Sequence, residues 1–334
     1  MKRLTCITAF VMTLSSCNFH AEYQTLNGFA LGTTYHIVYE DPVSESLLDI
    51  PALIERTFSD INASLSVYNK ESIISKINRN EAVDLDSLFI VVFHRAKEIY
   101  LLSEGAFDIS AAPFFDIWGF GLKNREQITQ AKLDSIAEFV GMDKISISDG
   151  KIVKTDLRIS LSANAIAKGY CSDLIASRMK GVGVKNLLVE VGGEIYCEGV
   201  NARGRKWSVG IDRPEYGNFI PGSDMQTMLT ISGQGIATSG NYRNYYEDDG
   251  QKYGHTVDPT TGKPVQHSLL SATVIASDCM SADAFATAFM VMGLEKSRRF
   301  LDAHPQLEAI LIFSDESGVF QSFATPNVHL LTKR

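Results

Sequence analysis

Two oxygen-bearing side chains, Asp283 and Thr287, lie four residues apart in a late, small-residue segment of the chain. Residues four apart share one face of an α-helix. A carboxylate and a hydroxyl suit a hard cation such as Mg²⁺, which usually binds beside phosphate. The pair therefore favours metal-assisted phosphoryl transfer. Two plainer roles stay open: Thr287 could bond back to a helix carbonyl, and Asp283 could only complement the helix dipole.

Lys168 and His255 are further candidates for chemistry. Lys168 lies near the start of a predicted small-residue helix, where free N–H groups and an ammonium attract an anion. The alternative is an exposed lysine on an Ala-rich helix. His255 stands between Gly254 and Thr256-Val257-Asp258-Pro259, a pattern typical of an exposed strand end. Because histidine exchanges protons near neutral pH, this setting favours a functional role over a structural one.

Aromatic and glycine-rich segments complete the set. Tyr68 follows a polar turn, and Gly-Ala-Phe-Asp at 105–108 precedes Trp118-Gly119-Phe120-Gly121. These rings could enclose a flat ligand or only cover the core. Val-Glu-Val-Gly-Gly-Glu at 189–194 predicts a strand whose glycines permit a tight turn or the close approach of a ligand.

The elements that must position these residues follow from hydrophobic periodicity and turn signals. The pattern predicts a helix from the N-cap Ser281 to Met292, with Gly293 just after its end. Further helices are predicted at 46–65, 85–104, 129–140 and 164–180, and strands at 29–39, 186–200, 206–211, 228–236, 270–275, 307–314 and 318–324, with a hairpin around Asp149-Gly150. Helices that alternate irregularly with hairpins indicate an α+β fold with a mostly antiparallel sheet.

Composition narrows the class of protein. The chain has 334 residues, of which 45% are hydrophobic and 21% charged, and a net charge of −8. This is an ordinary globular composition, enough for one large domain or two intimate lobes. Nothing in it is basic enough for a nucleic-acid groove, so we expect no nucleic-acid partner.

The N-terminus reads as a targeting segment. Met-Lys-Arg is followed by a short apolar run and by Leu14-Ser15-Ser16-Cys17, which resembles a bacterial lipobox. We expect a lipoprotein signal peptide at 1–16, lipidation of Cys17, a tether at 17–27 and one domain at 28–334; a plain signal peptide is the alternative. The remaining cysteines, Cys171, Cys197 and Cys279, share no motif spacing and are expected to be buried small hydrophobes.

Together these segments resemble the ApbE family of FAD:protein FMN transferases. The resemblance runs from Leu31 to about Gly293. Its pieces are Leu31-Gly32-Thr33, Ser66-Val67-Tyr68, Ala106-Phe107-Asp108, Trp118-Gly119-Phe120-Gly121, Ala165-Ile166-Ala167-Lys168-Gly169-Tyr170 with Asp173, Gly192-Gly193-Glu194, Ala237-Thr238-Ser239-Gly240, His255-Thr256-Val257-Asp258-Pro259-Thr260-Thr261-Gly262 and Ala282-Asp283-Ala284-Phe285-Ala286-Thr287.

The resemblance implies a fold and a reaction. The fold would be T-fold-related, a mostly antiparallel sheet packed with helices, with the flavin site between two intimate lobes. FAD would bind with its pyrophosphate beside Mg²⁺, and a Thr or Ser hydroxyl of an acceptor protein would take FMN while AMP leaves. Acceptors would be extracytoplasmic subunits of the Rnf complex or of sodium-pumping NADH:quinone reductase. A lipid anchor to a bacterial membrane, facing the periplasm, suits this work.

The resemblance also assigns residues. Asp283 and Thr287 would bind Mg²⁺ through their side chains, and Ala165 and Ala286 through backbone oxygens. His255 is the candidate proton acceptor or phosphate-orienting group, and Asp283 shares the catalytic role. The flavin nucleotide would be bound by Leu31, Tyr68, Ala106, Phe107, Asp108, Ser162, Lys168 and Val257. The chain departs from the family pattern at Ser162 and Glu194, where Asp is common.

Three other functions fit the same residues. A Mg²⁺-dependent FAD pyrophosphatase would use water in place of the acceptor hydroxyl and give FMN and AMP. A non-catalytic lipoprotein would bind FAD without turnover. A structural surface lipoprotein would bind no flavin.

Overall fold

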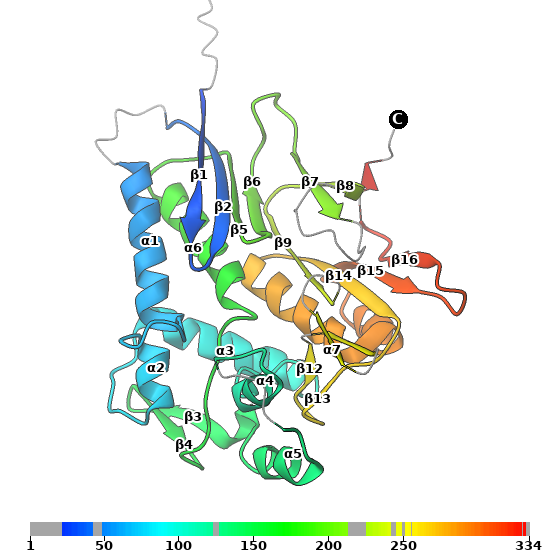
Figure 1. Cartoon of the computed structure of the whole chain (residues 1–334). Helices are drawn as coiled ribbons and strands as arrows, with labels where there is room; N and C mark the ends of the chain where they lie inside the picture. The colour runs from blue at the N-terminus through cyan, green and yellow to red at the C-terminus, as the bar shows by residue number, and fades with distance from the viewer. Residues whose placement is uncertain are drawn as a thin grey trace, which may run out of the picture.

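A single large antiparallel sheet organises the molecule (Figure 1). The computed structural model describes residues 22–42, 49–122, 127–212, 225–241, 245–248, 251–254, 256–328 and 330–331. The eight strands of the sheet, in spatial order, are β1 (Tyr23–Ala30), β2 (Thr33–Glu40), β5 (Leu187–Val191), β6 (Glu194–Glu198), β9 (Gln234–Gly240), β14 (Leu269–Ala276), β15 (Glu308–Ser314) and β16 (Phe320–Ala324). All neighbouring pairs are antiparallel, which confirms the predicted α+β class.

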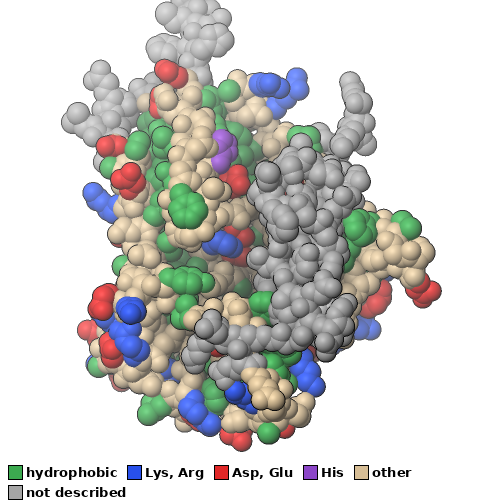
Figure 2. All heavy atoms as spheres, in the orientation of Figure 1, with side chains coloured by type: hydrophobic (Ala, Val, Ile, Leu, Met, Phe, Trp, Pro, Cys, Tyr) green, Lys and Arg blue, Asp and Glu red, His purple; other side chains and the backbone are tan. Residues whose placement is uncertain are grey.

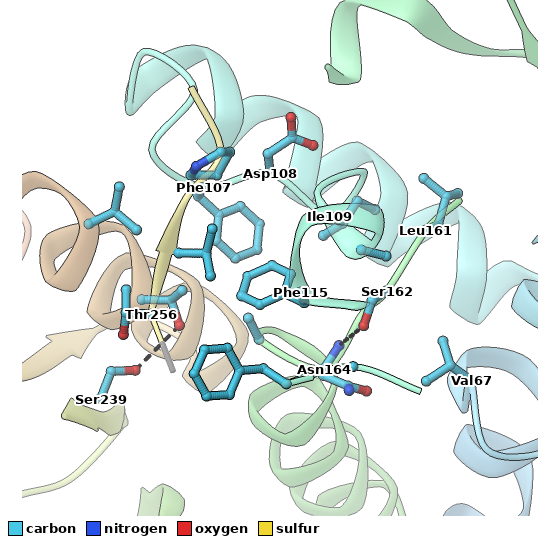
Figure 3. Close-up of a pocket in the computed structure, with 18 of the residues that line it drawn as sticks. Val67, Phe107, Asp108, Ile109, Phe115, Leu161, Ser162, Asn164, Ser239 and Thr256 are labelled. Carbon is cyan, nitrogen blue, oxygen red and sulfur yellow. Dashed lines mark hydrogen bonds between the residues drawn. The ribbon is translucent and has the colours of Figure 1, made fainter. Parts of the chain in front are cut away.

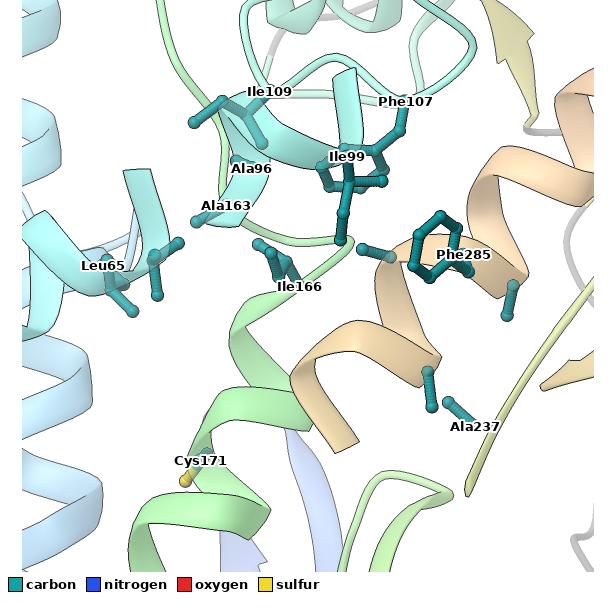
Figure 4. Close-up of a cluster of buried hydrophobic side chains, with 14 of the residues drawn as sticks. Leu65, Ala96, Ile99, Phe107, Ile109, Ala163, Ile166, Cys171, Ala237 and Phe285 are labelled. Carbon is teal, nitrogen blue, oxygen red and sulfur yellow. The ribbon is translucent and has the colours of Figure 1, made fainter. Parts of the chain in front are cut away.

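Helices cover one face of this sheet. The long helices α6 (Ala167–Gly181) and α7 (Cys279–Ala303) pack on the central strands and on each other. Around them lie α1 (Ile50–Leu65), α2 (Ile73–Asn78), α3 (Ser87–Leu102), α4 (Ala112–Trp118) and α5 (Gln130–Ala137). The main core lies where α1, α3, α6 and α7 meet, and it contains Leu65, Ile99, Ile166 and Phe285 (Figure 4). This core fixes the two helices that carry the candidate site.

A second, smaller core covers the opposite face. It is closed by a sheet of β7 (Trp207–Asp212), β8 (Met225–Ile231) and β17 (Leu330–Leu331). Along β15, Ala309 and Leu311 belong to the main core, whereas Ile310 and Ile312 belong to the second. Successive side chains of a strand point to opposite faces, so the sheet is buried on both sides here.

Short hairpins complete the described fold. They are β3 (Ile145–Ser148) with β4 (Lys151–Lys154), β10 (Tyr245–Asp248) with β11 (Gln251–Gly254), and β12 (Val257–Asp258) with β13 (Lys263–Pro264); a 3-10 turn covers Met142–Lys144. The hairpin predicted around Asp149-Gly150 is thereby confirmed. Cys171, Cys197 and Cys279 are free and buried, as expected.

Three strand predictions were too long because they ran through tight turns. The strand expected at 29–39 is the β1–β2 hairpin, in which Leu31 (φ 52°) and Gly32 (φ 77°) form the turn. Positive φ at both central residues is the geometry of a two-residue hairpin turn. Gly192 (φ 70°) and Gly193 (φ 102°) likewise divide 186–200 into β5 and β6, and the turn at Gly233 divides 228–236 between β8 and β9. The expected tether at 17–27 was also too long, because β1 begins at Tyr23.

The predicted bounds of two helices also need correction. The N-cap of α7 is Asp278 and not Ser281, because the Asp278 side chain accepts a hydrogen bond from the Ser281 N–H at 2.7 Å. Gly293 does not end this helix but bends it (φ 74°, ψ 177°), and the helix continues to Ala303. The helix predicted from residue 164 begins at Ala167.

The face of the molecule in Figure 2 carries charged side chains of both signs. On the face in Figure 2, basic and acidic side chains are interspersed over the coloured part of the molecule. Among the helices that the structure describes, none is long and apolar enough to span a bilayer. The predicted signal peptide and Cys17 lie outside the described residues.

Candidate functional site

A pocket of about 380 Å³ lies where the helical part of the molecule meets β9 and α7. One wall comes from the α1–α2 connection and the segment 106–122, and another from residues 160–168. Figure 3 shows the rings of Phe107 and Phe115 among the lining side chains, with Ser239 and Thr256 across from Ser162 and Asn164. The pocket thus draws its walls from both the helices and the large sheet.

Helix α7 presents both predicted metal-binding side chains to this pocket. The side chain of Asp283 is buried, with 3% of its surface exposed, and its Oδ2 accepts a hydrogen bond from the Gly169 N–H at 3.1 Å. The Thr287 hydroxyl shares a hydrogen bond with the Ser239 hydroxyl at 3.3 Å. Thr287 is therefore turned toward β9 and the pocket, as its predicted role requires.

Lys168 and Glu194 form an ion pair beside Asp283. The Lys168 ammonium lies 2.8 Å from Glu194 Oε1, at the start of α6 and of β6 respectively. Glu194 is almost fully buried, and its other oxygen, Oε2, has no hydrogen-bond partner among the described residues. Both side chains line the pocket. Lys168 thus stands at the wall of the pocket.

Two buried carboxyl groups, those of Glu194 and Asp283, lie near the Lys168 ammonium at this corner. Burial raises the pKa of Glu194 to about 7 and also raises that of Asp283, because a buried carboxylate is poorly solvated. Burial alone would lower the pKa of Lys168, but the charges of Asp283 and Glu194 outweigh it and raise that pKa. A divalent cation at this corner would favour the charged form of both carboxyl groups.

The donor set at this corner fits a hard cation. In the described part of the chain, no three His, Cys, Asp or Glu side chains are grouped to hold a metal, so a cation here would also need hydroxyl or backbone oxygens as ligands. Asp283 Oδ1 accepts no hydrogen bond from any described residue, and the Thr287 hydroxyl and Ala165 also line the pocket. Oxygen ligands of this kind are those that Mg²⁺ prefers.

The start of α7 is held by contacts that fix Asp283 in place. The Asp173 carboxylate accepts hydrogen bonds from the Cys279 and Met280 N–H groups, each at 2.8 Å. A Cβ on Gly169 would lie 2.3 Å from the Cys279 carbonyl oxygen, and one on Gly235 would lie 2.2 Å from the Cys279 nitrogen. Only glycine fits at both contacts. Asp173, Gly169 and Gly235 therefore clamp the first turn of α7.

Most of the predicted nucleotide-binding residues meet at the pocket. The lining includes Tyr68, Ala106, Phe107, Asp108, Ser162, Lys168 and Val257. Tyr68 is 71% exposed, which places its ring at the mouth of the pocket. The structure does not bring Leu31 or Ala286 to the lining, because Leu31 forms the β1–β2 turn and Ala286 is fully buried in α7. His255 lies outside the described residues.

Asp108 shapes the pocket wall through the backbone. Its Oδ1 accepts hydrogen bonds from the Ser110 N–H at 2.7 Å and the Ser110 hydroxyl at 2.6 Å. Burial raises the pKa of Asp108 to about 6. In Figure 3 its carboxylate points away from the Phe107 and Phe115 rings. These hydrogen bonds show that Asp108 fixes the turn that follows Phe107.

Sequence reasoning gave no role to several lining residues, among them Asn78, Phe115, Asn164, Ser239 and Thr256. The Asn78 side chain bonds both backbone groups of Leu161, at 2.7 and 2.8 Å, and so fixes the wall that carries Ser162. Nothing local in the sequence marks this contact, because Asn78 and Leu161 are 83 residues apart. Ser239 and Thr256 belong to segments that carry the resemblance, and their polar side chains were the available signal.

Comparisons with known proteins identify the family of this chain. The model of the ApbE family matches residues 31–311. A FAD:protein FMN transferase of Vibrio cholerae is 32% identical over 323 residues, which cover 95% of each chain. Its counterpart in Haemophilus influenzae is 31% identical and covers 94% of this chain and 93% of its own.

Solved structures show the same similarity. The flavin transferase ApbE from Vibrio cholerae has a TM-score of 0.81 at 31% identity, covering 92% of this chain and 98% of that chain. The apo form of the Pseudomonas stutzeri flavinyl transferase ApbE has a TM-score of 0.82 at 28% identity, covering 92% and 96%. The fold, the sequence and the residues at the pocket lead to one conclusion: this chain belongs to the ApbE family.

Proposed function

We propose that this protein transfers FMN from FAD to a Thr or Ser hydroxyl of an acceptor protein and releases AMP, with Mg²⁺ as cofactor. One observation supports this above the rest: Asp283, Thr287 and Lys168 meet at the wall of a pocket that also contains the rings of Phe107 and Phe115. Aromatic side chains suit a flat ring system, and the charged corner suits a diphosphate. The names of the similar enzymes of Vibrio cholerae and Haemophilus influenzae point to the same reaction.

The proposed reaction exchanges the phosphoanhydride bond of FAD for a phosphoester bond to the acceptor. The acceptor hydroxyl oxygen bonds to the FMN-side phosphorus, the bond from that phosphorus to the bridging oxygen breaks, and AMP leaves with that oxygen. Asp283 and Thr287, with the backbone oxygen of Ala165, would hold Mg²⁺, whose charge would neutralise the diphosphate. Lys168 would bind a phosphate oxygen as a point charge.

The remaining role is to take the proton of the acceptor hydroxyl. We assign this role to His255, which directly precedes Thr256 of the pocket lining in the sequence. Histidine titrates near neutral pH and is the most frequent general base. The chain's own contribution is thus to bind and orient the two reactants.

We also propose that the protein acts at the cell envelope. A lipid on Cys17 would anchor it to a bacterial membrane, facing the periplasm, where Rnf or sodium-pumping NADH:quinone reductase subunits would serve as acceptors. The lipobox-like Leu14-Ser15-Ser16-Cys17 supports the anchor. Replacing Cys17→Ser should move the protein from the membrane to the soluble fraction of fractionated cells; retention at the membrane would contradict the anchor.

Intact-mass spectrometry tests the reaction. The full-length protein in detergent is incubated with FAD, Mg²⁺ and a purified acceptor subunit encoded in the same genome. Transfer predicts an acceptor mass increased by one FMN residue and equimolar AMP, both lost when the acceptor hydroxyl is removed by Thr→Ala substitution. Free FMN and AMP with an unchanged acceptor would show a pyrophosphatase instead. Bound FAD without any AMP would show a binding protein.

A further inference from the structure

The proposed reaction gives Glu194 no role, although Glu194 forms an ion pair with Lys168 beside Asp283. A lysine beside a metal-binding carboxylate is a hazard, because its ammonium can neutralise that carboxylate in place of the cation. Lys168 and Asp283 are close: the Gly169 N–H, one residue after Lys168, donates to Asp283 Oδ2 at 3.1 Å. The charge of Asp283 also raises the pKa of Lys168.

The ammonium is nevertheless directed elsewhere. It lies 2.8 Å from Glu194 Oε1, and among the described residues Lys168 and Asp283 form no ion pair within 4.0 Å. Asp283 Oδ1 is left without a donor from the described chain and belongs to a pocket-lining side chain. Glu194 therefore holds the Lys168 ammonium, which Asp283 would otherwise attract.

The glycine pair before Glu194 makes this arrangement possible. A Cβ on Gly192 would lie 3.1 Å from Lys168 Cδ and 3.0 Å from Thr33 Cγ2, so the aliphatic part of Lys168 lies against the bare Gly192 backbone. The positive φ angles of Gly192 and Gly193 turn the chain directly into β6, whose first residue is Glu194. The Gly-Gly-Glu motif thus presents a carboxylate to the lysine that it borders.

We propose that Glu194 is a positioning residue that holds the Lys168 ammonium away from Asp283 and so keeps Asp283 available to a divalent cation. This inference rests on the proposed function, because it presumes a cation at Asp283. Without the charge of Glu194, the remaining buried carboxylate beside Lys168 is Asp283, and the lysine competes with the cation for it.

The proposal is tested by the binding of Mn²⁺ to the full-length protein without FAD. Binding is measured by electron paramagnetic resonance, as the loss of the signal of free Mn²⁺. Glu194→Gln should raise the Kd for Mn²⁺ about tenfold or more, since a paired buried charge is removed. Glu194→Asp keeps the charge and should bind Mn²⁺ within about threefold of the wild type. Glu198→Gln breaks the other ion pair between α6 and β6, which is partly solvated and lies outside the pocket lining, and should leave the Kd unchanged.

A second background separates positioning from simple charge. In a Lys168→Met protein no ammonium can move to Asp283, so adding Glu194→Gln should change the Kd for Mn²⁺ by less than about threefold. Equal weakening in both backgrounds would show that Glu194 acts only through its own negative charge, and would overturn the proposal. Lys168→Met alone should bind Mn²⁺ at least as tightly as the wild type, and weaker binding would also overturn it.

The outcome for the wild type distinguishes this inference from the proposed function. If the wild type binds Mn²⁺ and Glu194→Gln binds it equally well, the positioning role is wrong and the proposed reaction stands. If the wild type binds no Mn²⁺ and transfers FMN equally well with and without Mg²⁺, the metal site itself is wrong and the positioning role falls with it. The Lys168→Met measurement remains decisive where Glu194→Gln does not fold.

Discussion

Two ion pairs of the same residue types join the same two elements, α6 and β6. Lys168 and Glu194 are 2.8 Å apart beside the pocket, and Lys180 and Glu198 are 2.9 Å apart at the other end of the helix. Only 7% of the Glu194 side chain is exposed, against 31% of the Glu198 side chain. The residues and distances match, and the surroundings differ.

The surroundings change what each pair does. Beside Lys180, a hydrogen bond lowers the pKa of Glu198, so this half-buried carboxylate is stabilised in its charged form. At the pocket, burial raises the pKa of Glu194 to about 7 despite Lys168. An exposed pair contributes about 0–1 kcal/mol to stability, whereas a buried pair carries a desolvation penalty that can exceed its attraction. We therefore interpret the Lys168–Glu194 pair (the inner pair) as part of a binding site and not as a stabilising contact; the Lys180–Glu198 pair is the outer pair.

The largest effect on activity should come from substitution of Asp283, which lies beside the pocket at the N-terminal end of α6 (the inner end). Asp283→Ala should reduce the rate of FMN transfer by about a hundredfold or more, since in the proposed function it removes a ligand of the cation that neutralises the diphosphate. The rate is measured by intact-mass spectrometry of the acceptor at fixed Mg²⁺. If the variant kept the wild-type rate at low Mg²⁺, the N-terminal end of α6 would not be distinguished from the C-terminal end by a cation site.

Glycines at the two ends of α6 offer a matched test of packing. Gly169→Ala should lower the free energy of unfolding by about 1–3 kcal/mol, because a Cβ there meets the Cys279 backbone and must displace α7. Gly181→Ala has no atom within 4 Å of its Cβ and should be neutral or stabilising by up to about 1 kcal/mol. Urea denaturation measures both. Equal effects would mean that the clamp on α7 is looser than the contacts imply.

Asp173 should link the stability of the inner end to pH. Burial raises its pKa to about 7, above the ordinary value of 3.8, although it accepts two N–H bonds from α7. A carboxyl with a raised folded-state pKa contributes most stability below the unfolded pKa, and loses that contribution as pH rises through the folded pKa.

The variant Asp173→Asn isolates this contribution. The difference in free energy of unfolding between wild type and variant should be largest near pH 4 and shrink toward pH 7. The loss of cap hydrogen bonds should add a pH-independent cost of about 1 kcal/mol. Urea denaturation of both proteins across this range measures the difference; a gap that widens with rising pH would show that the ionised carboxylate is the stabilising form.

The smallest effect should come from the outer pair. Glu198→Gln should change the free energy of unfolding by less than about 1 kcal/mol and leave FMN transfer unchanged, since the pair is partly solvated and lies outside the pocket lining. Thermal unfolding and the transfer assay check the two halves of this statement. A loss of transfer here would mean that the site extends along α6 toward its C-terminal end.

The sequence alone was sufficient to predict features that depend on the spacing of neighbouring residues. The four-residue interval from Asp283 to Thr287 predicted one shared helix face, and both side chains line the pocket. Alternation and turn signals also predicted the antiparallel class. Strand propensity alone could not reveal the turn at Leu31-Gly32, since the β-branched and aromatic residues around it read as one strand.

Other features depend on contacts between distant segments. Asp173 meets Cys279 across 106 residues, and Gly169 meets Asp283 across 114. These contacts decide where α7 begins: two cap residues, Asp278 and Ser281, stand in the sequence, and the packing around Cys279 favours the first. The role of Glu194 likewise needs the turn that brings it to Lys168.

The most direct test of the site is the anomalous scattering of Mn²⁺ in crystals soaked with Mn²⁺ and FAD. The account predicts a single strong peak at coordination distance, about 2.0–2.3 Å, from a carboxylate oxygen of Asp283 and the hydroxyl of Thr287, with the FAD diphosphate as a further ligand. A pocket that binds FAD while no peak appears beside Asp283 would contradict the central claim.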